Sequence, residues 1–197
     1  MSDFVSYKSE IRFGLPLGTE WGAYLASMQA IFTPTEWQDD GSKPLLMYSM
    51  GSGSTWETMF NLDLVNPAIR TALAAGCAVV VSPFGGDQFG NATARNLMTN
   101  AFDYCRANVG VGPKAILAGF SMGSLNALNW AGNNPTKTKS IWVAGPLCDI
   151  ESFITSGGKS AMDAAYGATW TEAAFGATSN PKTMATAGKY NGIPIKI

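Results

Sequence analysis

The chain has 197 residues, of which 46% are hydrophobic and 14% are charged, and its net charge is −1 at pH 7. This length suits one domain, and the composition excludes an intrinsically disordered chain. The 13 basic residues are scattered, so no clustered footprint for nucleic acid is present, and the apolar runs are too short to cross a bilayer.

The first 40 residues give an irregular pattern. Residues 12–17 and 29–32 predict short strands, and residues 21–28 between them predict a helical turn. The N-terminus lacks the basic-then-apolar order of a secretory signal peptide. We therefore expect either a cytoplasmic chain or one that is assembled into a larger particle.

From residue 45 onward, short apolar runs alternate with segments of helical periodicity. The expected strands cover residues 45–48, 77–81, 114–118, 140–144 and 193–197. The expected helices cover residues 67–75, a segment from the N-cap Asn91 through Cys105, residues 124–131 and a weaker region at 150–189. This alternation predicts one α/β domain, residues 1–197, whose mostly parallel central sheet is covered by helices on both faces.

Ser121 lies in the run Gly119-Phe120-Ser121-Met122-Gly123, between an expected strand and an expected helix. A serine on such a turn is lifted clear of the sheet, and the helix N-terminus points at the negative charge that develops during acyl transfer. Side chains at positions 119 and 123 would collide with the neighbouring strand and helix, which explains both glycines. The alternative is an ordinary glycine-rich turn, and the strand–turn–helix setting favours the nucleophile.

At this motif the chain resembles the α/β-hydrolase superfamily, over roughly residues 44–197. The resemblance implies a serine esterase or lipase-like hydrolase that uses no cofactor and cleaves a small or lipid-like carboxylic ester through an acyl-enzyme. Residues 45–53 match the family's oxyanion loop, with Met50 where the family often has histidine. By this match the backbone N–H groups of Ser52 and Met122 form the oxyanion hole.

The family also implies an acid after a later strand and a histidine near the C-terminus, yet the sequence contains no histidine. Residues 191–197 look like the strand that precedes the acid. We therefore expect that the α/β-hydrolase fold is C-terminally incomplete, because its last strand would expose an apolar edge. A missing segment or a partner chain would complete the sheet and supply the base.

Two carboxylates are candidates for the acid or the pocket of the site. Asp149 follows the fourth strand of the regular region, where some family members place the acid; the alternative is that it caps the helix beginning at Ile150. Asp87 lies on a loop at the same sheet end as Ser121, as a pocket residue or as a solvated loop residue. Neither replaces the imidazole base.

Residues 150–189 stand where the family inserts a cap over the active site. Apolar residues in this segment, Trp170 among them, form either a pocket wall for an acyl or aryl group or ordinary core. With no histidine and no paired cysteines, we expect no zinc or other transition-metal site. Cys77, Cys105 and Cys148 are interpreted as reduced packing residues rather than disulfide or metal ligands.

Two functions of different classes follow. The first is a serine esterase with Ser121 as nucleophile, which family frequency favours over a peptidase. The second is a catalytically incomplete hydrolase-fold module with a binding or structural role in a larger assembly such as a virion. The missing histidine motivates the second hypothesis.

Overall fold

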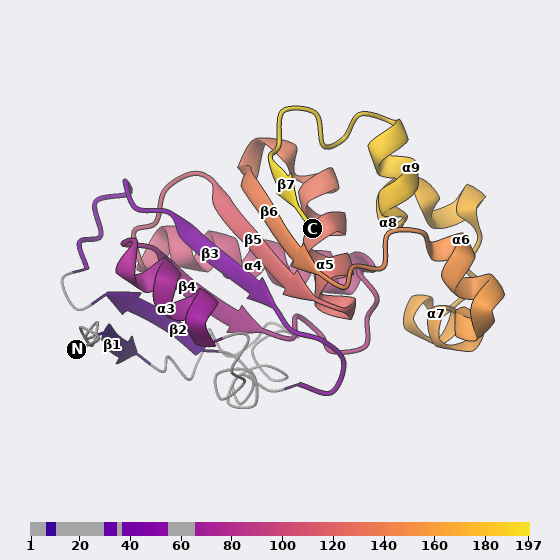
Figure 1. Cartoon of the computed structure of the whole chain (residues 1–197), viewed down its shortest axis with the longest axis horizontal. Coiled ribbons are helices and arrows are strands. Elements are labelled where there is room, and N and C mark those ends of the chain that lie inside the picture. The colour runs from indigo at the N-terminus through magenta and orange to yellow at the C-terminus, as the bar shows by residue number, and fades with distance from the viewer. Residues whose placement is uncertain (1–6, 11–29, 35–36, 55–65) are drawn as a thin grey trace.

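The computed structural model describes residues 7–10, 30–34, 37–54 and 66–197. Within this part of the chain the strands form one sheet in the order β1-β2-β4-β3-β5-β6-β7 (Figure 1). Their bounds are Tyr7–Glu10, Ala30–Pro34, Leu45–Ser49, Ala78–Ser82, Ala115–Phe120, Thr138–Ala144 and Ile195–Lys196 for β1 to β7. Strands β3 to β7 run parallel, whereas β2 is antiparallel to both β1 and β4. The predicted mostly parallel sheet is confirmed.

Helices cover both faces of this sheet, as predicted. The main helices that cover the sheet are α3 (Asn66–Ala74), α4 (Ala92–Asn108) and α5 (Met122–Asn133). Short helical segments follow: η1 Pro135–Lys137, α6 Ile150–Phe153, η2 Ile154–Gly158, α7 Lys159–Tyr166, η3 Glu172–Gly176, α8 Ala177–Ser179 and α9 Pro181–Thr186. In Figure 1 the segment from α6 to α9 lies at one end of the molecule, beyond α5.

Each strand sends alternate side chains to opposite faces, so the sheet has two cores. On one face Met47 and Leu117 pack in a cluster with Phe102 of α4 and Trp130 of α5. On the other face the cluster contains Leu46 and Val79 from the strands and Ile69 and Leu73 from α3. Burial on both faces explains why β3 and β4 are continuous apolar runs rather than alternating ones.

The second face is covered unevenly. Trp142 of β6 lies opposite Ala118 of β5, which belongs to the α3-side cluster, but the indole is 55% exposed. Phe120 is two residues beyond Ala118 on the same face, and its ring is 47% exposed. The described part of the chain therefore leaves an apolar strip on β5 and β6 that α3 does not reach.

The bounds of several helices and strands differ from those that the sequence predicts. The predicted helix 124–131 begins earlier, at Met122, and the strand predicted for 193–197 forms ladder pairs only at Ile195 and Lys196. The strand predicted for 29–32 is present as β2. Strand β1 carries no clear sequence pattern and was not predicted. The predictions for residues 12–17 and 21–28 lie outside the described residues.

The sequence predicts that the cysteines are packing residues. Cys77 and Cys105 are buried, and Cys148 packs partly buried against the larger core, as expected for packing residues. Burial raises the pKa of the thiols of Cys77 and Cys148.

Within the described ranges no helix is both long and apolar enough to span a membrane.

Candidate active site

Ser121 occupies the turn between β5 and α5 with φ of 53° and ψ of −123°. A positive φ is uncommon for a residue other than glycine and costs on the order of 1–3 kcal/mol, so the surroundings must impose it. The Ser121 N–H donates to the carbonyl oxygen of Ala144 at 2.9 Å. The hydroxyl of Ser124 donates to the same oxygen at 3.0 Å. The end of β6 thus fixes the turn, and Ser121 is exposed above it.

The glycines on either side of Ser121 are required by close backbone contacts. A Cβ at Gly119 would lie 2.4 Å from the carbonyl oxygen of Gly123. A Cβ at Gly123 would lie 2.1 Å from the carbonyl oxygen of Ser49, the last residue of β3. Both distances are shorter than real Cβ contacts allow. The collision expected from the sequence is therefore present, and any side chain at these positions would displace backbone.

The loop after β3 lies directly against Ser121. A Cβ added at Gly51 would be 3.8 Å from the Ser121 Cβ and 3.6 Å from the Phe120 carbonyl oxygen. Met50 is buried, and its N–H donates to the carbonyl of Ser82 at 3.1 Å, which ties the start of the loop to β4. The structure thus brings the predicted oxyanion loop and the predicted nucleophile together.

Two backbone N–H groups near this contact have no acceptor in the part of the chain that the structure describes. Met122 is the first residue of α5, and the N–H groups of a first helical turn have no intrahelical acceptor. Ser52 lies in the exposed turn that follows Gly51, and its N–H donates to no acceptor among the described residues. The role of both groups in an oxyanion hole stays a prediction.

A buried amide of α5 joins the end of β3 to the loop that precedes α4. Asn126 of α5 donates through Nδ2 to the Ser49 hydroxyl at 3.1 Å. Its Oδ1 accepts from the N–H of Gly90 at 2.8 Å. Asn126 is fully buried, so these two bonds replace the water that the amide gives up on folding. Sequence reasoning missed this residue, and the available signal was the presence of asparagine residues among the apolar residues of this helix.

Asp149 has two local partners. Its Oδ1 accepts from the N–H of Ser152 at 3.2 Å, which makes it the N-cap of α6. Its Oδ2 forms an ion pair with Lys182 Nζ at 2.8 Å. The hydrogen bond from Lys182, followed by that from Ser152, lowers the pKa of Asp149. The capping alternative is confirmed, and the role as catalytic acid stays a prediction.

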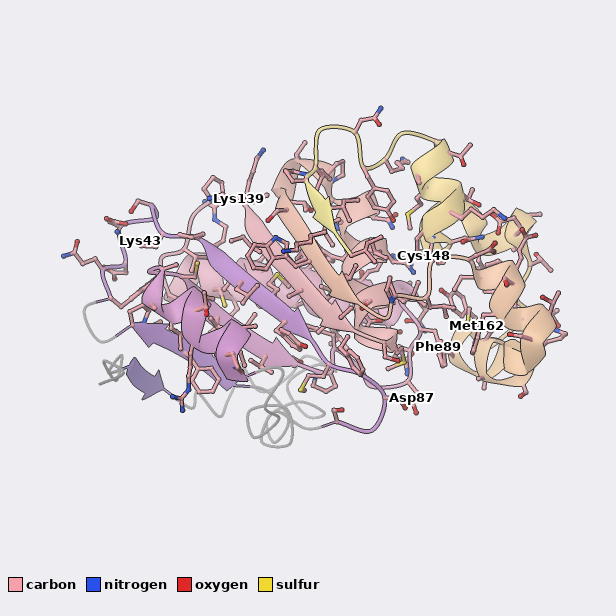
Figure 2. All side chains as sticks on the ribbon, viewed as in Figure 1. Lys43, Asp87, Phe89, Lys139, Cys148 and Met162 are labelled. Carbon is pink, nitrogen blue, oxygen red and sulfur yellow. The ribbon has the colours of Figure 1, made fainter. Side chains whose placement is uncertain are left out.

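The two predicted pocket residues lie in different surroundings. Asp87 is exposed on the loop beyond the carboxyl ends of the strands, as Figure 2 shows. Trp170 is buried in a cluster with Leu125, Ile150 and Met162. This packing matches the core alternative for Trp170, and a contact with substrate remains a prediction for both residues. No group of three or more cysteine, aspartate or glutamate side chains that could hold a metal occurs within the described ranges.

Solved structures resemble this fold and its elements. FphF, a fluorophosphonate-binding serine hydrolase of Staphylococcus aureus, superimposes with a TM-score of 0.66 at 15% identity, over 85% of this chain and 70% of that one. An S-formylglutathione hydrolase from Agrobacterium tumefaciens gives 0.63 at 13% identity, over 85% and 78%. The chain has the α/β-hydrolase fold.

The likeness extends to larger proteins and stops at the level of fold. A structure from a study of two prolyl endopeptidases matches with a TM-score of 0.55 at 20% identity, over 82% of this chain but 24% of that one. No protein-family model and no curated protein matches the sequence. At identities of 13–20% the structural likeness supports a shared fold. Function has to be argued from the residues of the site.

Proposed function

We propose that this protein is a serine hydrolase in which Ser121 is the nucleophile and a carboxylic ester is cleaved through an acyl-enzyme. The observation that carries the proposal is the strained, exposed Ser121 at the strand–helix turn, packed against the Gly51 loop. Strain of this kind persists where the fold over-determines it, and it is concentrated at functional sites. An ordinary turn would need neither the positive φ at a serine nor two glycines in contact with backbone.

The N–H groups of Met122 and Ser52 form the oxyanion hole in this proposal. Both lack protein acceptors within the described residues, and both lie on segments that meet at Ser121. Backbone donors do not depend on side-chain identity, so Met50 does not disable the hole. Helix α5 adds the positive end of its dipole at the same point. Removing one such donor in an enzyme typically costs about 10²–10³ in kcat.

The base that deprotonates Ser121 is assigned to a residue outside these 197. The sequence contains no histidine, and imidazole is the group that takes a serine proton near neutral pH in this chemistry. A further segment or a partner chain would supply it. A small or lipid-like ester is proposed as the substrate. One structural neighbour, an S-formylglutathione hydrolase, is named for a small thioester, whose hydrolysis is also an acyl transfer.

A fluorophosphonate probe tests the proposal on the native protein. We expect covalent labelling that disappears in Ser121→Ala and persists in Ser160→Ala, which removes an exposed hydroxyl in α7. Labelling retained in Ser121→Ala would contradict the nucleophile assignment. Circular dichroism of each variant shows whether the fold is intact.

A second function, a hydrolase-fold module with a binding or structural role in a larger assembly such as a virion, is favoured by the absence of histidine. The two functions predict different intact masses for the native protein. A mass near 20.8 kDa with no labelling of folded protein supports the module. A larger mass, with a histidine in the additional sequence and labelling of Ser121, supports the enzyme.

A further inference from the structure

A hollow lies away from the Ser121 turn. It has a volume of about 380 Å³ and lies between the N-terminus of α4 and the segment from α7 to α8. Its walls include Gln88 and Arg95 on one side and Tyr166, Phe175 and Ser179 on the other. Among the described residues no aspartate or glutamate lines it, and none of these lining residues belongs to the Ser121 turn or the Gly51 loop.

Arg95 is the one charged residue in this wall, and its neighbours are neutral. Its Nη1 donates to the carbonyl oxygens of Gly90 at 2.8 Å and Thr178 at 3.2 Å, and to the hydroxyl of Ser179 at 3.1 Å. Among the described residues no carboxylate forms an ion pair with it. Burial lowers the pKa of Arg95, as expected for a cation that has lost water without gaining a counterion.

The Nε and Nη2 donors of the guanidinium remain available. A guanidinium carries five N–H donors in a planar fork. The three bonds described above all leave from Nη1, and Nε and Nη2 donate to no residue in the described ranges. If Arg95 served only to hold α4 and α8 together, the hydrogen bonds from Nη1 would be sufficient. The unused edge has the geometry that binds a carboxylate or phosphate through two parallel hydrogen bonds.

Further donors surround the same hollow. Ala92 and Thr93 begin α4, a helix of 17 residues, and their N–H groups have no intrahelical acceptor. Asn91 caps the helix by accepting from Ala94, which leaves the first two N–H groups and the positive end of the helix dipole to a ligand. Thr93 itself is one of the residues that line the wall. The described lining of the site is therefore rich in hydrogen-bond donors and includes no acidic side chain.

An aromatic pair forms the opposite wall. The rings of Tyr166 and Phe175 meet edge to face with centroids 4.9 Å apart. The Tyr166 hydroxyl donates a hydrogen bond to the Phe89 carbonyl oxygen at 3.1 Å. These rings offer apolar surface next to the guanidinium, which suits a ligand with an acidic group on an apolar or aryl body.

We propose that this hollow binds an oxyanion, a carboxylate or phosphate carried on an apolar group, with the free edge of Arg95 as its anchor. The anion supplies the counterion that the protein does not provide. The aromatic pair contacts the body of the ligand. This assignment stands on its own and does not require Ser121 to be a nucleophile.

Isothermal titration calorimetry of the full chain tests the site, with sodium phosphate and sodium benzoate as separate probes at constant ionic strength. Thr93→Glu is the principal variant, because it places a carboxylate in the hollow and leaves the Nη1 bonds of Arg95 intact. An acidic residue in the first turn also favours the helix, so the variant is expected to fold. Asn100→Glu adds the same charge to an exposed position of α4 and is the matched control.

We expect one saturable site with a Kd below about 1 mM for at least one probe. Affinity should fall at least about tenfold in Thr93→Glu and stay unchanged in Asn100→Glu. Arg95→Gln should weaken binding equally, with Arg106→Gln, at the other end of α4, as its control. Binding of phosphate alone identifies a phosphorylated ligand, and binding of benzoate alone identifies a carboxylate. Absence of saturable heat with both probes, or equal affinity in Thr93→Glu and wild type, overturns the proposal.

Discussion

The N–H of Ser121 donates to the carbonyl oxygen of Ala144 across the ends of two adjacent parallel strands. This bond continues the β5–β6 ladder one step beyond Phe120, so the positive φ of Ser121 is reached without losing a backbone hydrogen bond. The strain at the candidate nucleophile is therefore held by the sheet itself. Small shifts of β6 or β3 relative to α5 should therefore disturb the backbone conformation of Ser121, even where the rest of the fold is unchanged.

Gly123→Ala should destabilise the protein strongly, because the new Cβ would lie 2.1 Å from a backbone oxygen that cannot rotate away. Forced overpacking of this kind costs about 1–3 kcal/mol or more. Urea unfolding measures the loss. Gly41→Ala is the control, since a Cβ there meets nothing within 4 Å and the cost is limited to its φ of 75°. Equal midpoints for the two variants would show that β3 does not press on this glycine.

Asn126→Ala should lower stability through its hydrogen bonds as well as its volume. The substitution leaves the Gly90 N–H and the Ser49 hydroxyl buried without their partner. Each unsatisfied buried group costs about 1–3 kcal/mol. Asn100→Ala, on the exposed side of α4, serves as the reference in the same denaturation experiment. If Ser121 is the nucleophile, fluorophosphonate labelling of folded Asn126→Ala should also slow, because Ser49 pairs with Gly119 and packs against Gly123 of the Ser121 turn.

The sequence predicts the layered α/β fold and the Ser121 turn because both depend on local patterns. Apolar runs mark β3, β4, β5 and β6, and the glycines of the turn are neighbours in the chain. The contacts of Asn126 join residues 36 and 77 positions apart. The Arg95 hollow joins α4 to residues more than 80 positions away. Periodicity carries no information about such partners, so these features required the structure.

Trp142→Thr should reduce binding of a fluorescent apolar dye with little loss of stability. The indole is 55% exposed on β6, and threonine retains the β propensity of this position. Dye fluorescence and urea midpoints are measured together. Trp130→Thr is the contrasting variant, because that side chain is fully buried against α4 and its truncation should cost about 3–5 kcal/mol. A large loss of stability in Trp142→Thr would show that the strip on β5 and β6 is covered.

Asp149→Asn separates the structural role of this carboxylate from the proposed catalytic one. Asparagine retains the cap on α6, so the variant mainly loses the ion pair with Lys182. The pKa of Asp149 lies below its ordinary value of 3.8 in the folded protein, so the stabilisation is present above that value and disappears as pH falls through the lowered pKa. The thermal midpoints of wild type and variant should therefore differ slightly at pH 7 and low salt. They should converge at acid pH and at high salt, because the pair is exposed to solvent. Labelling of Ser121 should survive the substitution if Asp149 is only a cap, whereas its loss in a folded variant would assign Asp149 to the catalytic machinery.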